Sequence, residues 1–267
     1  MSESSDLRGW KQHAYELFEA QAELYHASRE QQQGFRAQLA IVLRCLPGGT
    51  GRVLDLGCAA GSEVSALRAH GFAVVGLDFS PRMLAYAQRR FANNPEVQFC
   101  HADCEFLPFP AACFDHITCL GVLEYLPDYG RATAEIARVL RPGGLAVFSI
   151  PNRLSLYHLT CGFATAAIGP VWRPVKRLLR RPKAPAAPPT PWHSRNLCVP
   201  WRFRRLLRRE GLEPVASAYS NFSVFPFDRL WSEMNLRLAA ALECFSDSRL
   251  VGWTALQYLV AARKSSK

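Results

Sequence analysis

The sequence predicts an α/β fold in which helices cover a mostly parallel sheet, because short apolar runs alternate with helix-like segments. Strands are expected at residues 53–56, 74–77, 97–100, 113–120 and 145–150. Helices are expected between them at residues 62–70, 81–92 and 131–140. Strand–helix–strand units of this kind form right-handed crossovers, so the five strands should run parallel with their carboxyl ends at one edge of the sheet.

The first strand runs into a turn of small residues, Gly57-Cys58-Ala59-Ala60-Gly61. Such a turn lets backbone N–H groups come close to a ligand. Asp78, about 20 residues further on, ends the next apolar run and is placed to accept hydrogen bonds from ribose hydroxyls. A cofactor of the nucleoside type is therefore expected at this edge of the sheet.

The same turn argues against a dinucleotide. Dinucleotide-binding enzymes need glycines at G-x-G-x-x-G spacing to cradle a pyrophosphate, whereas here the last glycine, Gly61, comes one residue too early. No lysine or arginine lies between Val53 and Leu67 to hold a phosphate. A ligand without phosphate groups fits better.

Two more carboxylates accompany Asp78. Asp55 lies in the first strand, and Asp103 follows the third, within reach of an adenine amino group. Each acid also has a purely structural interpretation: Asp55 as a cap of the turn, Asp78 as a helix N-cap before Ser80-Pro81, and Asp103 as a solvated loop acid. Because ligands bind at the carboxyl ends of parallel strands, acids at three such ends favour one shared site.

A fourth strand leads into Leu120-Gly121, and a helix stops at Arg141-Pro142-Gly143-Gly144 before the fifth strand. In their order and spacing these blocks, over residues 52–152, strongly resemble the class I S-adenosylmethionine (SAM) dependent methyltransferases. The resemblance is greatest to the subgroup of quinone-biosynthesis and small-molecule O- or C-methyltransferases. It implies a Rossmann-like, doubly wound sheet of seven strands, the last antiparallel, with an N-terminal helical layer and helical inserts after strands 5 and 6. Residues 212–219 and 255–262 are expected to form the last two strands.

The resemblance also implies that SAM is the cofactor, and it implies roles for nine residues. Asp55, Gly57 and Gly61 would line the methionine part, Asp78 would take both ribose hydroxyls, Phe79, Asp103 and the backbone of Cys104 would meet the adenine, and Leu120 and Gly121 would pass under the cofactor. The family often has glycine where this chain has Ala59, whose methyl group narrows the approach to the cofactor.

Four regions are expected along the chain: an N-terminal helical layer (1–50), the SAM-binding core (51–152), a basic and apolar insert with a lid (153–211), and C-terminal strands with a helical insert (212–267). The last region belongs to the same domain as the core, because 267 residues, 49% of them hydrophobic, suffice for one sizeable core. The polar start lacks a secretory signal, and nine cysteines without metal-ligand spacing indicate a reducing, cytoplasmic setting and no metal site.

The insert accounts for the whole net charge of +10. From Arg153 to Arg209 there are thirteen basic and no acidic residues, whereas the rest of the chain has 19 basic against 22 acidic residues. Glycines, a proline and His158 make the apolar run 154–172 unsuited to a membrane span. Two interpretations stay open: a lid with solvated charges, or a lid that also lies on an anionic membrane through the cluster from Arg173 to Lys183, worth ~1 kcal/mol per basic residue.

These features predict a SAM-dependent methyltransferase that methylates an oxygen of a lipophilic or lipid-linked small molecule, as a cytoplasmic protein that is peripheral at the inner membrane face. An oxygen that must lose its proton benefits from a base within hydrogen-bond reach. His193 is the preferred base, since it precedes a helix in the region where the resembled enzymes build their acceptor pocket. His158, Glu124 and Tyr125 are further candidates.

Other functions stay open at this point: methylation of a sugar or another polar metabolite, methylation of RNA, or SAM binding or membrane adaptation without turnover. Basic charge alone fits nucleic acid. However, the segment from Leu120 to Tyr125 lacks the Asn/Asp-Pro-Pro-aromatic sequence expected for methylating a flipped base, so nucleic acid is not the favoured acceptor. The oligomeric state is open as well.

Overall fold

The computed structural model of the chain describes residues 15–16, 18–20, 22, 32–159, 196–222, 232–248 and 251–266. Seven strands lie within these ranges and form one sheet. They are β1 (Arg52–Leu56), β2 (Ala73–Asp78), β3 (Val97–His101), β4 (Phe114–Cys119), β5 (Leu140–Pro151), β6 (Leu212–Phe222) and β7 (Ala255–Lys264). The predicted number of strands is confirmed.

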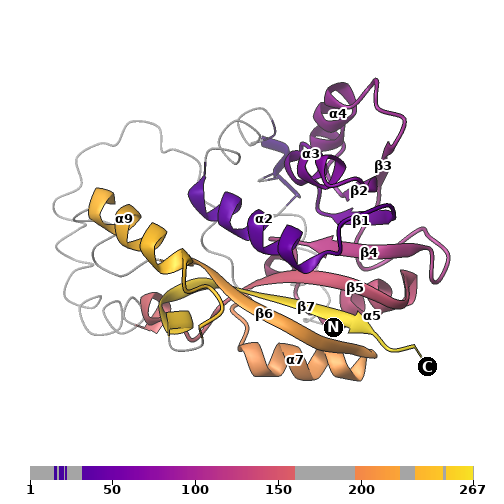
Figure 1. The fold of residues 1–267 in the computed structure, drawn as a ribbon. Helices are drawn as coiled ribbons and strands as arrows, with labels where there is room; N and C mark the ends of the chain where they lie inside the picture. The colour runs from indigo at the N-terminus through magenta and orange to yellow at the C-terminus, as the bar shows by residue number, and fades with distance from the viewer. Residues whose placement is uncertain are drawn as a thin grey trace, which may run out of the picture.

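The strands lie in the order β3-β2-β1-β4-β5-β7-β6 (Figure 1). Strands β1 to β5 run parallel, whereas β7 lies antiparallel between β5 and β6. The predicted Rossmann-like sheet with an antiparallel last strand is therefore confirmed. The strand order changes direction between β1 and β4, and ligands of such sheets bind outside the carboxyl ends of the strands at this point.

Helices cover both faces of the sheet (Figure 1). They are α2 (Gln33–Cys45), α3 (Ser62–Ala69), α4 (Pro81–Arg90), α5 (Gly130–Val139), α7 (Pro200–Arg209) and α9 (Ser232–Glu243), with two short 3-10 helices, η1 (Leu123–Tyr125) and η2 (Val251–Thr254). Apolar residues of α2, α3 and α4 pack on one face, and those of α5 and α7 pack on the other. Helix α2 belongs to the expected N-terminal layer, and α7 and α9 lie in the expected inserts after β5 and β6.

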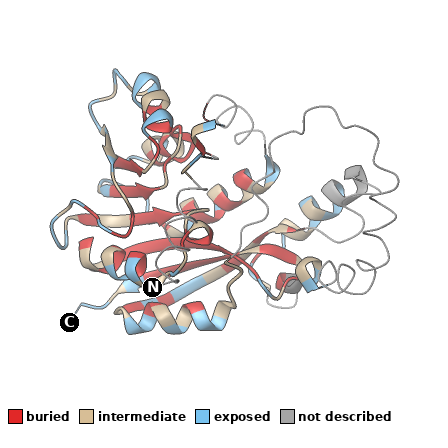
Figure 2. Cartoon of the chain, turned by 180° about the vertical axis from the view of Figure 1, so that it is seen from behind, coloured by how far each residue is buried: buried red, intermediate tan, exposed pale blue. Residues whose placement is uncertain are grey.

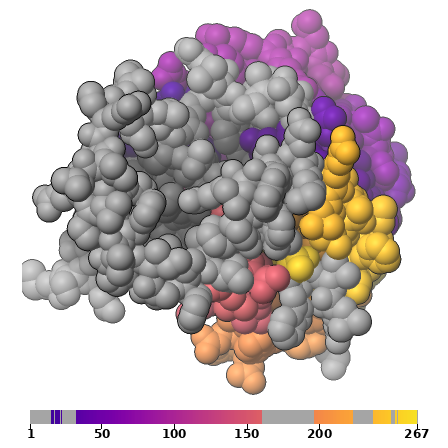
Figure 3. Space-filling model, turned by 90° about the vertical axis from the view of Figure 1, so that its left-hand side faces the viewer, coloured from indigo at the N-terminus to yellow at the C-terminus, as the bar shows by residue number. Residues whose placement is uncertain are grey.

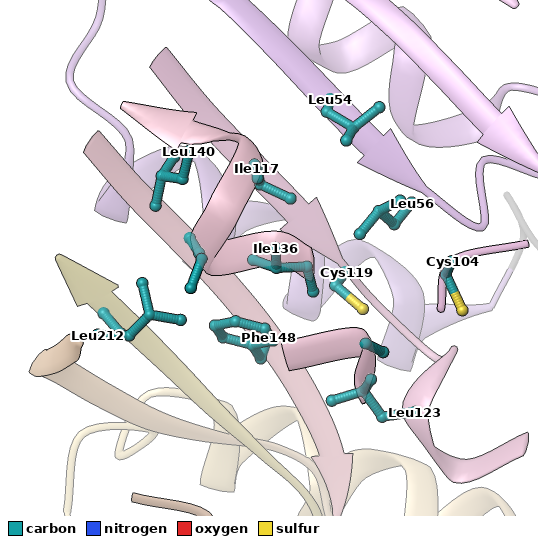
Figure 4. Packing of buried hydrophobic residues seen from close by; sticks show 14 of the residues in the cluster. Leu54, Leu56, Cys104, Ile117, Cys119, Leu123, Ile136, Leu140, Phe148 and Leu212 are labelled. Carbon is teal, nitrogen blue, oxygen red and sulfur yellow. The ribbon is translucent and has the colours of Figure 1, made fainter. Parts of the chain in front are cut away.

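Alternating strand residues build the core on both faces. Leu54 and Leu56 of β1 pack on the face covered by α5 and α7, whereas Val53 packs on the opposite face. Around Phe148 of β5, residues from the neighbouring strands and from α5 converge (Figure 4). The central strands are buried along most of their length, as a parallel sheet covered by helices requires (Figure 2).

The start of β5 differs from the expectation. The sequence predicts that the strand begins at Leu145, after a Pro-Gly-Gly turn, but β5 begins at Leu140, directly after α5. Leu140 already pairs with Phe114, and the register then shifts before the pairing resumes at Leu145. Gly144 allows this shift because a Cβ there would lie 2.6 Å from the backbone oxygen of Asp115.

Among the described helices, none combines the length and the apolar character needed to cross a bilayer. The cysteines that the structure describes are free thiols. The predicted membrane-contact cluster from Arg173 to Lys183 and the predicted base His193 lie outside the described residues.

Candidate cofactor-binding site

A pocket opens at the carboxyl ends of β1, β2 and β4, where the strand order changes direction. Seven of the nine predicted cofactor residues line it: Gly57, Asp78, Phe79, Asp103, Cys104, Leu120 and Gly121. Asp55 and Gly61 are not part of this lining, and their contact with the methionine part stays a prediction. Within the described lining there is no lysine or arginine, which suits a ligand without phosphate groups.

The turn after β1 forms the edge of the pocket and depends on glycine. Gly57 has a φ of +73° and donates its N–H to the backbone oxygen of Leu77 at 2.7 Å. A Cβ at Gly57 would lie 2.3 Å from Cγ2 of Val122, so no other residue fits there. Gly61, with a φ of +81°, ends the turn and is the N-cap of α3. Ala59 has a φ of +46°, which L-residues with a Cβ adopt only at a cost of roughly 1–2 kcal/mol.

Asp78 holds this turn to the end of β2. Its Oδ2 accepts a hydrogen bond from the N–H of Ala59 at 2.8 Å, and its Oδ1 accepts one from the N–H of Ser80 at 2.9 Å. The N-cap of α4 is Ser80, whose Oγ accepts from the N–H of Met83 at 3.1 Å. The interpretation of Asp78 as a helix N-cap is therefore wrong, because Ser80 takes that role and Asp78 faces the pocket.

The environment of Asp78 opposes its charge. Burial raises the pKa of Asp78 to about 6, although the backbone N–H donors of Ser80 and Ala59 favour the ionised form. A carboxylate has about four acceptor positions, and backbone donors occupy only part of them. Asp78 therefore lines the pocket as an acceptor that further hydroxyl donors would stabilise.

Asp55 lies behind the turn and not in the pocket wall. Its carboxyl group is fully buried, and Oδ1 accepts from Oγ1 of Thr118 at 2.8 Å. Its Oδ2 is also buried and has no hydrogen-bond partner among the described residues. Burial raises the pKa of Asp55 well above its usual range, and the nearby carboxylate of Glu63 raises it further. Glu63 is not among the residues predicted for the site; its signal in the sequence is an acid in the first turn of α3, directly after the glycine turn.

Asp103 lies at the other end of the pocket. Its Oδ1 accepts from the N–H of Glu105 at 2.9 Å, so the loop after β3 is closed on itself. The backbone oxygen of Asp78 binds the N–H of Ala102 at 3.2 Å and fixes this loop beside β2. Asp78 and Asp103 thus line one pocket at the ends of neighbouring strands, and a contact of Asp103 with the adenine stays a prediction.

Aromatic and aliphatic side chains complete the pocket, and of these the sequence predicts only Tyr125, as a candidate base. Phe18, Val122, Tyr125 and Leu126 line it together with the cofactor residues. Phe18 packs edge-to-face against Tyr125, with ring centroids 5.0 Å apart, and against Phe79 at 6.2 Å. The apolar periodicity of the N-terminal helix marks Phe18 as buried, but it does not reveal the surface that Phe18 covers.

The candidate bases lie in different places. Tyr125 lines the pocket, whereas His158 and Glu124 are not among its described lining residues. Nδ1 of His158 lies 2.9 Å from the backbone oxygen of Asn152 and 2.7 Å from Oγ of Ser155. Nδ1 therefore carries the proton and Nε2 keeps the lone pair. Burial lowers the pKa of His158, which keeps the ring neutral near pH 7.

These residues fit SAM, which carries a sulfonium and an ammonium group. The carboxylates of Asp78 and Asp103 line the pocket. Acidic groups attract a cationic cofactor and repel a phosphate. No group of three or more potential metal ligands is clustered in the described part of the chain.

Residues 54–148 match the family model described as "Methyltransferase domain". The demethylmenaquinone methyltransferase of Thermus thermophilus is 44% identical over 104 residues, which make up 38% of this chain and 47% of that protein. The ubiquinone biosynthesis O-methyltransferase of Aromatoleum aromaticum is 38% identical over 104 residues, 38% of this chain and 44% of that protein. The chain thus matches about half the length of these curated relatives.

Solved structures share the fold over nearly the whole chain. An S-adenosylmethionine dependent methyltransferase from Mesorhizobium loti has a TM-score of 0.58 at 24% identity, covering 88% of this chain and 99% of that one. The [4+2]-cyclase SpnF has a TM-score of 0.63 at 18% identity, covering 96% and 97%. A cyclase among these structures means that the fold alone does not specify methyl transfer.

The family match, together with a pocket without described lysine or arginine at the point where the strand order reverses, supports a class I SAM-dependent methyltransferase domain over residues 54–148. SAM is the cofactor of such a domain.

Asp78→Asn is expected to weaken SAM binding by about 10- to 100-fold, because hydrogen bonds to a charged acceptor contribute about 1.5–3 kcal/mol.

In the unchanged protein, SAM binding should weaken as the pH falls through about 6, since the proton that Asp78 takes up removes an acceptor. The raised pKa also lowers the stability of the cofactor-free protein as the pH rises from about 4 to about 6. Isothermal titration calorimetry from pH 5 to 8 measures the affinity.

Asp115→Asn is the matched control, because Asp115 lies at the amino end of β4 and binds the N–H of Arg52 at 2.8 Å. This variant should bind SAM as the unchanged protein does. If Asp78→Asn also kept full affinity, or kept the pH dependence, Asp78 would not be the ribose acceptor.

Ala59→Gly should leave the fold intact and change the free energy of unfolding by about 0 to +1 kcal/mol, since relief of the left-handed strain is partly offset by the greater freedom of glycine in the unfolded chain. SAM affinity should stay equal or increase, because a methyl group that lines the pocket is removed. Ala112→Gly, at a φ of +53° and outside the pocket lining, is the control and should change stability only. Weaker SAM binding in Ala59→Gly alone would mean that the methyl group supports the cofactor.

Proposed function

We propose that the chain transfers the methyl group of SAM to an oxygen atom of a lipophilic or lipid-linked small molecule. The observation that supports this most is the composition of one pocket, which is lined both by Asp78 and Asp103 and by Phe18, Tyr125 and Leu126. The acids suit the ribose and adenine of the cofactor, and the aromatic and aliphatic side chains suit an apolar acceptor.

The chemistry requires little covalent work from the protein. When bound, SAM supplies a methyl group that its sulfonium makes electrophilic. The residues of this chain have to align the acceptor oxygen with the C–S bond and to exclude water. The edge-to-face contacts of Phe18 with Tyr125 and Phe79 serve exclusion, because Phe18 is only 9% exposed and covers the pocket from the N-terminal layer.

Two further observations support a lipophilic acceptor. Two relatives that match the core are named a demethylmenaquinone methyltransferase and a ubiquinone biosynthesis O-methyltransferase. The cluster from Arg173 to Lys183 supplies basic charge for contact with an anionic membrane, where a lipid-linked acceptor would be found. We therefore propose a peripheral position at the cytoplasmic face of a membrane.

Transfer of label identifies the acceptor class. The full chain is incubated with methyl-labelled SAM and, separately, with total lipid extract, a pool of polar metabolites, and RNA. Label in an extractable lipid is expected. Treatment of the product with mild base then distinguishes a methyl ether, which survives, from a methyl ester, which is hydrolysed. Label in RNA or in polar metabolites instead would overturn the lipophilic acceptor, and SAM binding without any transfer would favour a non-catalytic protein.

His193 is proposed as the general base. His193→Asn should lower kcat by about 10²- to 10⁴-fold and leave the affinity for SAM unchanged, because a base acts on the acceptor and not on the cofactor. His158→Asn is the comparison, since His158 is held by Asn152 and Ser155 outside the described pocket lining. A loss of kcat in His158→Asn with full activity in His193→Asn would transfer the role to His158.

A further inference from the structure

Helix α7 is anchored to the sheet by two residues. Phe203 and Leu207, one helical turn apart, are 1% and 0% exposed. The ring of Phe203 packs edge-to-face against Phe148, with centroids 5.5 Å apart, and against Tyr129 at 6.0 Å. These contacts fix which side of α7 faces the core and therefore which side faces outward.

The outward side of α7 is strongly basic, and Figure 2 shows exposed positions along this helix. It consists of Trp201, Arg202, Arg205, Arg208 and Arg209, all exposed, and is named here the basic face. The spacing of three and four residues places these side chains on one continuous stripe.

Little in the described structure neutralises the basic face. Arg208 pairs with Glu213 at 3.0 Å, but both side chains are more than half exposed, so this pair is weak. Arg202 shares a groove with Asp128 without forming an ion pair. Within the described ranges, Arg205 and Arg209 have no acidic partner either, and the stripe therefore carries uncompensated positive charge.

An apolar corner adjoins the start of α7. The segment after β5 is tied to the segment before α7, because the N–H of Arg153 donates to the backbone oxygen of Cys198 at 3.0 Å. Figure 3 shows the end of β5 and the residues that follow it (pink) beside the segment that contains α7 (orange). Leu156 and Leu159 are 40% and 51% exposed here, and Trp201 is 62% exposed.

We propose that the basic face and this apolar corner dock the protein on a membrane of anionic phospholipids. Arginine guanidinium groups bind phosphate in a bidentate manner. An exposed tryptophan and two leucines suit the boundary between headgroups and acyl chains. RNA would offer phosphates to the arginines, but it offers nothing to exposed leucines, because nucleic-acid sites use stacking on aromatic rings. The inference rests on the part of the proposed function that places the acceptor at a membrane, and it assigns the contact to described residues.

Vesicle flotation without SAM tests this docking independently of methyl transfer. The full chain is floated with vesicles of phosphatidylserine and phosphatidylcholine, and with phosphatidylcholine alone. Arg205→Gln/Arg209→Gln should bind the anionic vesicles about 30-fold more weakly, at ~1 kcal/mol per basic residue. Arg89→Gln/Arg90→Gln removes the same charge from exposed residues of α4, which lies at the opposite end of the molecule in Figure 1, and should bind as the unchanged chain does.

The unchanged chain should not float with vesicles of phosphatidylcholine alone. Its binding to the anionic vesicles should weaken at high salt. Equal flotation of the α7 and unchanged proteins, equal losses in both double variants, or no flotation of the unchanged chain would each overturn the proposal. Tight, salt-sensitive binding to RNA without flotation would overturn it in favour of a nucleic-acid surface. Methyl transfer to a detergent-dispersed acceptor should be unchanged in the α7 variant, so failure of docking and failure of the proposed enzyme activity are distinguished.

Discussion

The hydrogen bonds of the Asp78 carboxylate connect the parts of the cofactor site. One oxygen holds the backbone of Ala59 in the glycine turn, and the other holds the backbone of Ser80 at the start of α4. The carboxylate is 5% exposed, so these donors offset part of the cost of its burial. Without them the turn, the end of β2 and the first residue of α4 would lose their common partner. The fold thus holds the carboxylate of Asp78 in place before the cofactor binds, and its remaining acceptor positions are available for the ribose hydroxyls.

The site is acidic within a cationic protein. Asp55, Glu63 and Asp78 gather around one turn, and burial raises the pKa of both Asp55 and Asp78. The excess positive charge belongs to the part of the sequence from Arg153 to Arg209, and none of the residues that the structure describes there lines the pocket. Exposed charges are screened over roughly 8 Å at physiological salt. The pocket therefore suits a cationic cofactor, whereas the basic face of α7 is proposed to contact an anionic surface.

Much of the fold follows from the sequence, because strand ends and glycine turns are local features. Asp78 and Asp103 could be assigned to one pocket since parallel strands end at one edge of the sheet. The direction in which the side chain of Asp55 points could not be predicted, because a hydrogen bond to Thr118 on the neighbouring strand decides it. The early start of β5 depends on a register shift against β4, which is a tertiary feature. Phe18 reads as an ordinary buried residue of a helix, and its place in the pocket wall depends on how that helix packs.

The family match covers only part of the chain, and this explains why the cofactor can be assigned while the acceptor is proposed. The family match ends at residue 148, and the curated relatives match about half of their own length. The predicted cofactor residues all lie in the matching part, whereas the proposed acceptor would contact side chains inside it, such as Tyr125 and Leu126, and outside it, such as Phe18. The apolar side chains of the pocket and the basic face of α7 both agree with the proposed acceptor, because a lipid-linked acceptor and an anionic membrane occur together.

The most direct measurement is a crystal structure of the chain with S-adenosylhomocysteine. We expect the ribose hydroxyls on the carboxylate of Asp78, the adenine between Phe79 and the loop of Asp103 and Cys104, and the sulfur toward Phe18 and Tyr125. Density for the ligand at another surface, or a ribose that makes no contact with Asp78, would contradict this arrangement.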